Sequence, residues 1–271
     1  MDKWKIRDRY IDLCGPMKIM GILNITPDSF SDGGDYNTVE GALERARMMI
    51  ENGASILDIG GESTRPGSDP VSEEEEIRRV VPVIRAIRSE SDIPISVDTY
   101  REATARAALE AGADIVNDVW GFRKEPKIAD VVNEFGAGCV LMSNACGIEH
   151  ENIRDLRDRC YERSLEIARK AGVKDEQILL DPGVGFGTTR TEDIELMKDL
   201  EKFSNILLGV SRKRIVDHLL GGDTKPRERV EGSVGLALAG AVKGVKVIRV
   251  HDVKETADAL KTFEAVMKGE Y

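Results

Sequence analysis

The sequence predicts an α/β fold, namely a single (β/α)8 TIM barrel whose active site lies at the C-terminal ends of the strands. Short apolar runs recur eight times, segments with helical spacing separate them, and most runs end in a polar cluster. Parallel strands are apolar because both of their faces are buried. The length of 271 residues suits this fold, which typically needs about 250. The expected strands are 17–24, 56–60, 94–98, 114–118, 138–142, 178–181, 206–210 and 246–250.

A predicted helix follows every one of these strands. The phrases E-N-G-A-S-I-L-D, E-A-G-A-D-I-V-N and E-F-G-A-G-C-V-L share one device, a helix that ends at glycine just before a buried strand. The helix at 72–90 begins with S-E-E-E-E, and acidic residues stabilise a helix N-terminus. The expected helices are 38–52, 72–90, 101–111, 126–135, 152–171, 192–202, 227–243 and 253–268. We expect 1–271 to form one domain, with 1–16 as an N-terminal extension that covers the bottom of the barrel.

Charge and composition exclude several classes of partner. The net charge of −10 argues against nucleic acid and against an anionic membrane surface. The N-terminus lacks an apolar signal core, and no segment is apolar for long enough to span a bilayer. The four cysteines form no C-x-x-C pair and have no metal-ligand spacing, which is typical of free thiols in a reducing compartment. We therefore expect a cytoplasmic protein whose partners are small molecules.

Acidic and amide side chains end three of the predicted strands. Asp98, Asn117 and Asp181 follow the third, fourth and sixth apolar runs, so all three are expected in the mouth of the barrel. An ionised carboxylate is an acceptor with two oxygens, and it can take a bidentate pair of N–H donors. The pattern indicates a site for a flat heterocycle rich in N–H groups. The alternative for each residue is that it caps a loop or a helix.

Cationic side chains follow the last two strands. Arg249 and His251 form R-x-H, and residues two apart in a strand point the same way. The loops after strands seven and eight are the usual phosphate site of this fold, so the pair predicts a two-pronged anion site. Lys213 follows strand seven, at a position where a helix begins. A positive charge is unfavourable at a helix N-terminus because of the helix dipole, so a lysine there indicates a functional role. Ser211 and Arg212 beside it favour electrostatic binding over a Schiff base.

Asn24 ends the first strand, opposite the predicted anion site. Its amide oxygen suits Mg²⁺, which prefers few protein ligands together with phosphate and water. Two loops rich in glycine and proline, 25–37 and 60–71, are candidates for segments that order over a ligand. The sequence thus predicts a heterocycle, a phosphate and a magnesium ion at one end of the barrel.

Several long motifs resemble those of the dihydropteroate synthase family. They are G-I-L-N-I-T-P-D-S-F-S-D-G-G (21–34), G-A-S-I-L-D-I-G-G-E-S-T-R-P-G (53–67), S-V-D-T-Y, V-N-D-V-W-G, L-L-D-P-G-V-G-F-G, G-V-S-R-K-R and I-R-V-H-D-V. The resemblance covers about residues 17 to 262. It implies a transferase of folate biosynthesis that joins 4-aminobenzoate to 6-hydroxymethyl-7,8-dihydropterin diphosphate, releases pyrophosphate and needs Mg²⁺. It also implies a sulfonamide target and a homodimer, for which 227–268 is a candidate face.

The resemblance also implies a role for each matching residue. Catalysis would rest on Asp98, Asp181, Lys213, Arg249 and His251. The pterin would lie against Asp98, Asn117, Met142, Asp181 and Lys213. The diphosphate would lie on Asn24, Arg65, Arg249 and His251, with Mg²⁺ on Asn24. The aminobenzoate would be surrounded by Phe30, Thr64, Arg65, Pro66 and Phe186, with Arg214 as a further contact for its carboxylate. The implied mechanism is a dissociative substitution without a covalent enzyme intermediate.

Three positions depart from the family pattern. Ser143 stands where many members have His, Thr188 where many have Lys, and Arg214 where the family often has Ser. Ser143 and Thr188 put the edges of the pocket in question, and Arg214 either attracts the aminobenzoate carboxylate or faces solvent. The alternative readings are a pterin-dependent methyltransferase acting on a corrinoid protein, a non-catalytic pterin-binding protein and an unrelated phosphosugar enzyme. The intact diphosphate residues favour the synthase.

Overall fold

The computed structural model describes residues 2–25, 34–62 and 71–269 and confirms the predicted (β/α)8 barrel. Within these residues the main sheet has eight parallel strands in the order β8-β7-β6-β5-β4-β3-β10-β9. A parallel bridge between Leu180 and Ile206 joins its two ends and closes the barrel. The strands are β3 Lys18–Asn24, β4 Ile56–Gly60, β5 Ile95–Asp98, β6 Ile115–Asp118, β7 Gly138–Met142, β8 Ile178–Asp181, β9 Leu207–Leu208 and β10 Val247–Val250.

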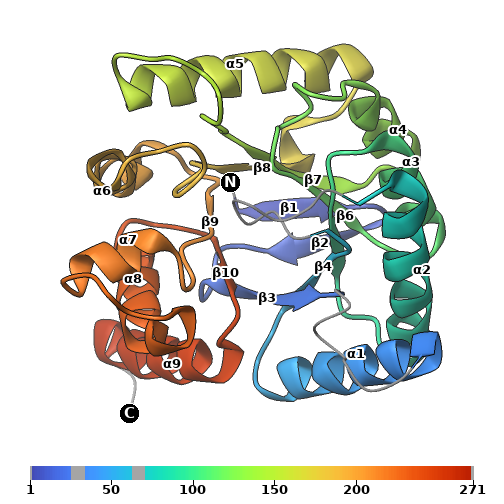
Figure 1. Cartoon of the computed structure of the whole chain (residues 1–271), viewed down its shortest axis with the longest axis horizontal. Coiled ribbons are helices and arrows are strands. Elements are labelled where there is room, and N and C mark those ends of the chain that lie inside the picture. Colours follow the sequence, from blue (N-terminus) through green and yellow to red (C-terminus); the bar gives the residue numbers. More distant parts are fainter. Residues whose placement is uncertain (1, 26–33, 63–70, 270–271) are drawn as a thin grey trace.

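Helices surround the strands on all sides (Figure 1). They are α1 Gly34–Glu51, α2 Glu73–Glu90, α3 Glu102–Glu110, α4 Lys127–Phe135, α5 Ile153–Ala171, α6 Arg190–Lys198, α7 Arg214–Leu219, α8 Val230–Val242 and α9 Val253–Lys268. Short 3₁₀ turns lie at Asp175–Gln177, Leu200–Lys202 and Pro226–Glu228. No helix of the described ranges is long and apolar enough to cross a membrane.

The helix boundaries differ from expectation in three places. The helix expected at 38–52 begins four residues earlier, at Gly34. The helix expected at 192–202 ends at Lys198, and a 3₁₀ turn follows it. The helix expected at 227–243 begins at Val230, again after a 3₁₀ turn, and α7 before it was expected only as a helix start beside Lys213, without a range. With six residues, α7 is too short to show a helical period in the sequence. The glycine stops are confirmed, since Gly53, Gly112 and Gly136 follow the ends of α1, α3 and α4 within two residues and have positive φ.

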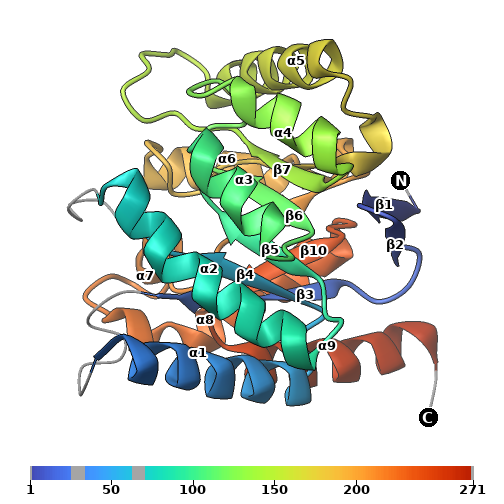
Figure 2. The ribbon, with the colours of Figure 1, turned by 90° about the vertical axis from the view of Figure 1, so that its right-hand side faces the viewer.

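An N-terminal hairpin closes the bottom of the barrel, as expected for 1–16. Strands β1 (Lys3–Ile6) and β2 (Arg9–Asp12) pair antiparallel and lie at one end of the barrel, the right-hand edge of Figure 2. The Trp4 indole donates to the Gln177 carbonyl over 2.8 Å. Three buried residues of this segment pack on a ring of inward-facing strand residues, which we name the lower layer. The lower layer consists of Met20, Ile56, Ile115, Val140, Leu179, Leu207 and Val247.

The inward positions become polar farther along the same strands. Successive side chains of a strand alternate between its two faces, so a residue two positions after a lower-layer residue also points inward. This places Asp58 above Ile56 and Arg249 above Val247. We name the polar inward residues near the C-terminal ends the upper layer. The upper layer consists of Asp58, Asp98, Asn117, Asp181 and Arg249.

Candidate active site

Strand register brings the predicted polar residues side by side. Asn24 pairs with Gly60, Gly60 with Asp98, and Asp98 with Asn117. On the far side of the barrel, Asp181 is the register partner of Met142. The predicted polar residues of four strands, Asn24, Asp98, Asn117 and Asp181, therefore lie at the C-terminal mouth of the barrel, as the sequence predicted.

Arg249 reaches across the barrel to two carboxylates. Its Nε donates to Asp58 Oδ2 over 2.5 Å and its Nη2 to Asp98 Oδ2 over 2.7 Å. The Asn117 amide also donates to Asp58 Oδ2, over 3.2 Å. The sequence interpretation missed Asp58, which is fully buried in β4. An acid at an inward position of an otherwise apolar strand was the signal that could have found it.

Two carboxylate oxygens in this cluster have no hydrogen-bond partner among the described residues. They are Asp58 Oδ1 and Asp98 Oδ1, both buried. Buried polar atoms are nearly always paired, so orphaned acceptors at the C-terminal ends of the barrel strands indicate a ligand with donors. Burial raises the pKa of Asp98 to about 7, with Arg249 opposing the shift and Asp58 adding to it. The site therefore offers acceptors whose charge is poorly solvated.

Asp181 and Lys213 form the opposite wall. Asp181 Oδ1 accepts from the Gly183 N–H over 2.7 Å, and burial raises the pKa of this carboxyl against the pull of Lys213. The Lys213 amine donates to the Val184 carbonyl over 2.6 Å and lies 4.5 Å from the centre of the Phe186 ring. Burial of the amine lowers its pKa to about 8. Lys213 is thus held at the site and is not a freely solvated lysine.

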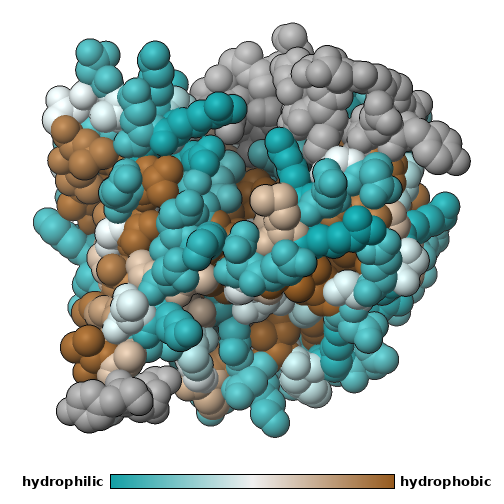
Figure 3. Space-filling view, turned by 90° about the horizontal axis from the view of Figure 1, so that it is seen from below, coloured by the Kyte–Doolittle hydropathy of each residue, from teal (hydrophilic) through white to brown (hydrophobic). Residues whose placement is uncertain are grey.

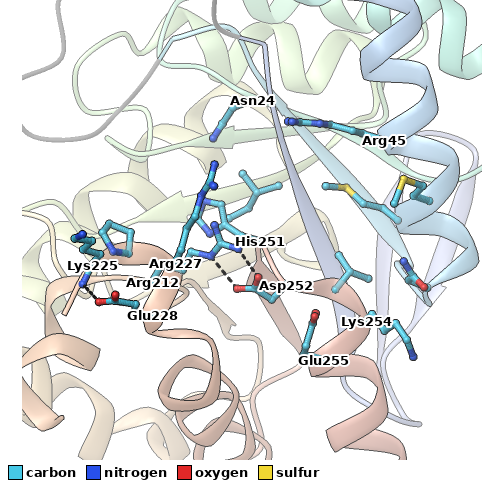
Figure 4. Close-up of a pocket in the computed structure, with 16 residues that line it drawn as sticks. Asn24, Arg45, Arg212, Lys225, Arg227, Glu228, His251, Asp252, Lys254 and Glu255 are labelled. Carbon is cyan, nitrogen blue, oxygen red and sulfur yellow. Dashed lines mark hydrogen bonds and ion pairs between the residues drawn. The ribbon is translucent and has the colours of Figure 1, made fainter. Parts of the chain in front are cut away.

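A cation-rich pocket of about 1160 Å³ lies at the C-terminal ends of β3 and β10 (Figure 4). Asn24 and His251 line it, together with Arg45, Lys225 and Arg227. The His251 ring nitrogen Nδ1 lies 3.1 Å from Ser211 Oγ. Arg249 and His251, expected as one two-pronged site, are divided here: the guanidinium pairs with the upper-layer acids and the imidazole lines the pocket.

The N-terminus of α9 also borders this pocket. Asp252 is its N-cap residue, yet its side chain makes no capping hydrogen bond. Both of its oxygens instead accept from Arg212, from Nε over 2.9 Å and from Nη2. A helix N-terminus favours an anion because its first N–H groups lack helical partners. The charge of Arg212 is therefore balanced by Asp252. The positive potential of this pocket comes from the other cationic side chains of its lining and from the N-terminus of α9.

The remaining predicted residues fall into two groups. Phe30, Thr64, Arg65 and Pro66 belong to 26–33 and 63–70, outside the described residues. Three positions can be placed: Met142 is buried at the end of β7, Phe186 lies beside Lys213, and Arg214 is exposed at the start of α7. Of the family departures, Ser143 and Thr188 are both buried.

Comparison with known proteins decides the family. A family model described as pterin binding enzyme matches residues 20–251. A dihydropteroate synthase of Clostridium beijerinckii is 46% identical, over 92% of this chain and 94% of that protein. The chain belongs to the dihydropteroate synthase family. As a member, it is an enzyme, a transferase of folate biosynthesis.

Solved dihydropteroate synthases share the fold. The Xanthomonas albilineans enzyme with 4-aminobenzoic acid has a TM-score of 0.90 at 39% identity, covering 98% of both chains. The same enzyme in complex with 7,8-dihydropteroate has a TM-score of 0.87 at 38% identity, covering 97% of this chain and 98% of that one. These relatives are synthases, which favours the synthase over the methyltransferase alternative.

Proposed function

We propose that the chain condenses 6-hydroxymethyl-7,8-dihydropterin diphosphate with 4-aminobenzoate, giving 7,8-dihydropteroate and pyrophosphate. The observation that carries this proposal is the orphaned pair of buried acceptors, Asp58 Oδ1 and Asp98 Oδ1, beside a cation-rich pocket. A heterocycle with N–H donors and an attached anion would satisfy both parts together. Residues 1–271 act as one catalytic domain in this proposal.

The pterin lies in the upper layer. Asp98 and Asn117 bind the ring from one side, and Asp181 and Lys213 from the other. Met142 packs against its face. The free carboxylate oxygen of Asp98 accepts ring N–H groups, and the Lys213 amine donates to a ring acceptor. Arg249 remains at the edge of the ring, where it can exchange one carboxylate for the substrate.

The diphosphate lies at the pocket that His251 and Asn24 line, with Arg65 and Arg249 as further cationic contacts. His251 Nδ1 lies 3.1 Å from Ser211 Oγ, and the imidazole belongs to the lining of the pocket, where it can donate to a phosphate oxygen. The N–H groups that begin α9 supply further donors. The pocket carries positive charge locally although the chain has a net charge of −10. This placement makes anion recognition a property of the site and not of the whole surface.

The residues at the pocket fit Mg²⁺ as a partner of the diphosphate. The described residues contain no group of three or more His, Cys, Asp or Glu side chains that could hold a metal ion. Asn24 offers a neutral amide oxygen there, and Mg²⁺ typically takes one or two protein oxygens with the rest from phosphate and water. When bound, Mg²⁺ would stabilise the negative charge of the leaving diphosphate.

The reaction is a substitution at the methylene carbon attached to the pterin. The C–O bond breaks first, and its electron pair leaves with pyrophosphate, whose charge His251 and Arg249 stabilise. The cation is delocalised into the pterin, beside the carboxylates of Asp98 and Asp181. The amine of 4-aminobenzoate then forms the new C–N bond and releases one proton. Thr64, Arg65, Pro66, Phe30, Phe186 and Arg214 surround this second substrate.

Two variants test the proposal. His251→Ala should weaken pterin diphosphate binding by roughly 2–5 kcal/mol, because a charged ligand loses a desolvated partner, and should leave free pterin binding unchanged. Arg163→Ala is the matched control: Arg163 is an exposed arginine of α5 that pairs with Glu166 and does not line the pocket, so its loss should change neither affinity strongly. Calorimetry measures both ligands, and formation of dihydropteroate from the two substrates with Mg²⁺ measures turnover. Equal affinities of wild type and His251→Ala for pterin diphosphate would contradict the assignment.

The chain acts as a homodimer in this proposal, through the segment 227–268. Apolar side chains gather at the left of Figure 3. Val242 at the end of α8 is 69% exposed and Val266 of α9 is 81% exposed. A second copy packed on this face would bury them. Light scattering of wild type and Val242→Glu tests this, since a dimer held by this face should become a monomer.

The proposed location is the cytoplasm. All four cysteines are free, two of them exposed. Free thiols of this kind are typical of a reducing compartment.

A further inference from the structure

A glycine-rich segment covers Lys213. Residues 183–188 follow β8, and Gly185 in this segment has φ +83. A Cβ atom at Gly185 would lie 3.1 Å from Lys213 Cδ, so the backbone passes directly over the lysine stem. The segment also supplies the Val184 carbonyl and the Phe186 ring that contact the amine. The position and burial of Lys213 therefore depend on where this segment lies.

One buried carboxylate on a neighbouring helix holds the segment. Asp193 of α6 is 0% exposed. Its Oδ1 accepts from the Gly185 N–H over 2.7 Å and from Thr188 Oγ1 over 2.5 Å. Arg190 pairs with its other oxygen over 2.6 Å. Thr188, one of the departures from the family pattern, thus points its hydroxyl at Asp193 and ties the end of the segment to α6.

We propose that Asp193 is a positioning residue that acts through the 183–188 segment to hold Lys213 at the pterin-binding wall. Asp193 does this without a direct contact to the amine, by fixing Gly185 and Thr188. The inference rests on the proposed function for its consequence in catalysis, but the placement of Lys213 is a property of the protein alone. Nothing in the pattern of short motifs assigned a role to Asp193.

Two effects of Asp193 on Lys213 have opposite signs, which makes the proposal testable. Burial lowers the Lys213 pKa to about 8, while nearby Asp181, Asp193 and Asp98 raise it and Arg249 lowers it. If Asp193 acted only by its charge, its removal would lower the lysine pKa. If it holds the covering segment, its removal exposes the amine, and the pKa rises from about 8 toward 10.5.

The experiment is competitive labelling of lysines with an amine-reactive anhydride over a pH series, with Lys213 read from its own peptide by mass spectrometry. Asp193→Ala should raise the Lys213 pKa. Each unit of rise makes the labelling rate near pH 7 about tenfold lower, because only the neutral amine reacts. Asp193→Asn keeps one oxygen to accept from Gly185 and Thr188, so it should restore the wild-type position and show no rise. Thr188→Val, which removes one tie, should give a smaller rise.

Asp199→Ala is the matched control. Asp199 ends the same helix, is also buried and pairs with Lys202 over 2.8 Å, but it does not contact the 183–188 segment. This variant should lose stability without moving the Lys213 pKa. A fall or no change in the Lys213 pKa of Asp193→Ala overturns the proposal. If Asp193→Ala does not fold, Thr188→Val decides, and no rise there overturns it.

A binding measurement links the placement to function. Asp193→Ala should weaken pterin binding several-fold at pH 7, and Asp193→Asn should not. Labelling needs no substrate, so it tests the positioning role of Asp193 separately from the proposed pterin site. A higher Lys213 pKa in Asp193→Ala with unchanged pterin binding would contradict the placement of the pterin against Lys213 and would still support the positioning role. An unchanged lysine pKa contradicts the positioning role whatever the enzyme binds.

Discussion

The lower and upper layers of the barrel interior differ although the same strands build both. In the lower layer, Leu179 and Val247 pack against the hairpin and have no polar partner to satisfy. Two residues farther along the same strands the side chains are ionisable: Asp181 accepts a hydrogen bond from the Gly183 N–H, and Arg249 pairs with Asp58 and Asp98. The lower layer stabilises the fold by burying apolar surface, whereas the upper layer keeps buried charges that water would solvate better.

The difference shows that the residues that stabilise the fold and the residues of the candidate site occupy separate layers of the barrel interior. Residues two apart in a strand point in one direction, so a single strand serves both purposes without a change in backbone. A change in the lower layer should therefore cost folding free energy, and a change in the upper layer should cost ligand affinity. Four experiments test that separation, from the largest expected effect to the smallest.

Trp4→Ala should lower the free energy of unfolding by about 3–5 kcal/mol, the usual loss for truncating a large buried aromatic side chain. Trp4 is 0% exposed and closes the lower layer from below. Urea unfolding measures the loss. The folded fraction should keep the wild-type kcat/KM, and a parallel loss of activity would show that the two layers are not separable.

Asp98→Asn should weaken pterin binding by about 2–5 kcal/mol, because an ionic acceptor inside the site is lost. Its free energy of unfolding should stay level or rise, since a buried carboxylate is costly to desolvate and Arg249 keeps Asp58 as a partner. Calorimetry with a dihydropterin and urea unfolding measure the two quantities. A stability loss as large as that of Trp4→Ala would place Asp98 among the structural residues.

The upper layer should also make stability depend on pH. The Asp98 pKa is about 7 in the folded protein against 3.8 as its ordinary value, so the folded state holds a proton that the unfolded chain has released. The stabilisation is fully present below pH 3.8 and is lost as pH rises toward 7, at most about 1.4 kcal/mol per pH unit.

Urea unfolding between pH 5 and 8 measures this slope. Asp118, whose pKa burial raises to about 6, adds to it at lower pH. Asp98→Asn should flatten the curve between pH 6 and 7, and Trp4→Ala should shift it downward without flattening it. A wild-type curve that rises with pH over this range would contradict the charge state assigned to the upper layer.

Arg214→Ala should have the smallest effect. The side chain is exposed at the start of α7, and exposed ion pairs contribute at most about 1 kcal/mol. We expect the KM for 4-aminobenzoate to change less than about fivefold, and less at high salt. Steady-state kinetics at two salt concentrations measure this. A much larger change would place Arg214 inside the aminobenzoate site and show that an exposed residue outside both layers takes part in binding.

Local sequence determined the order of elements and the end of the barrel that carries chemistry. The apolar runs match the strands to within a few residues, because a strand buried on both faces leaves a continuous apolar mark. Gly53, Gly112 and Gly136 mark helix ends for an equally local reason, since a residue with positive φ is needed there. The sequence was sufficient to place Asp98, Asn117 and Asp181 at strand ends, because each of them stands at or near the end of an apolar run.

Only the tertiary structure decided which of these residues meet. Arg249 and Asp58 are 191 positions apart, and closure of the barrel brings them to 2.5 Å. Arg249 was expected to bind a phosphate group of the ligand, but in the folded protein its guanidinium pairs with the carboxylates of Asp58 and Asp98. The roles of Asp58 and Asp193 were likewise hidden, since each depends on neighbours from distant strands or from a segment folded back over Lys213. A sequence pattern indicates which face of a strand a side chain lies on. Its contact partners are decided by the closure of the barrel, which brings distant strands together.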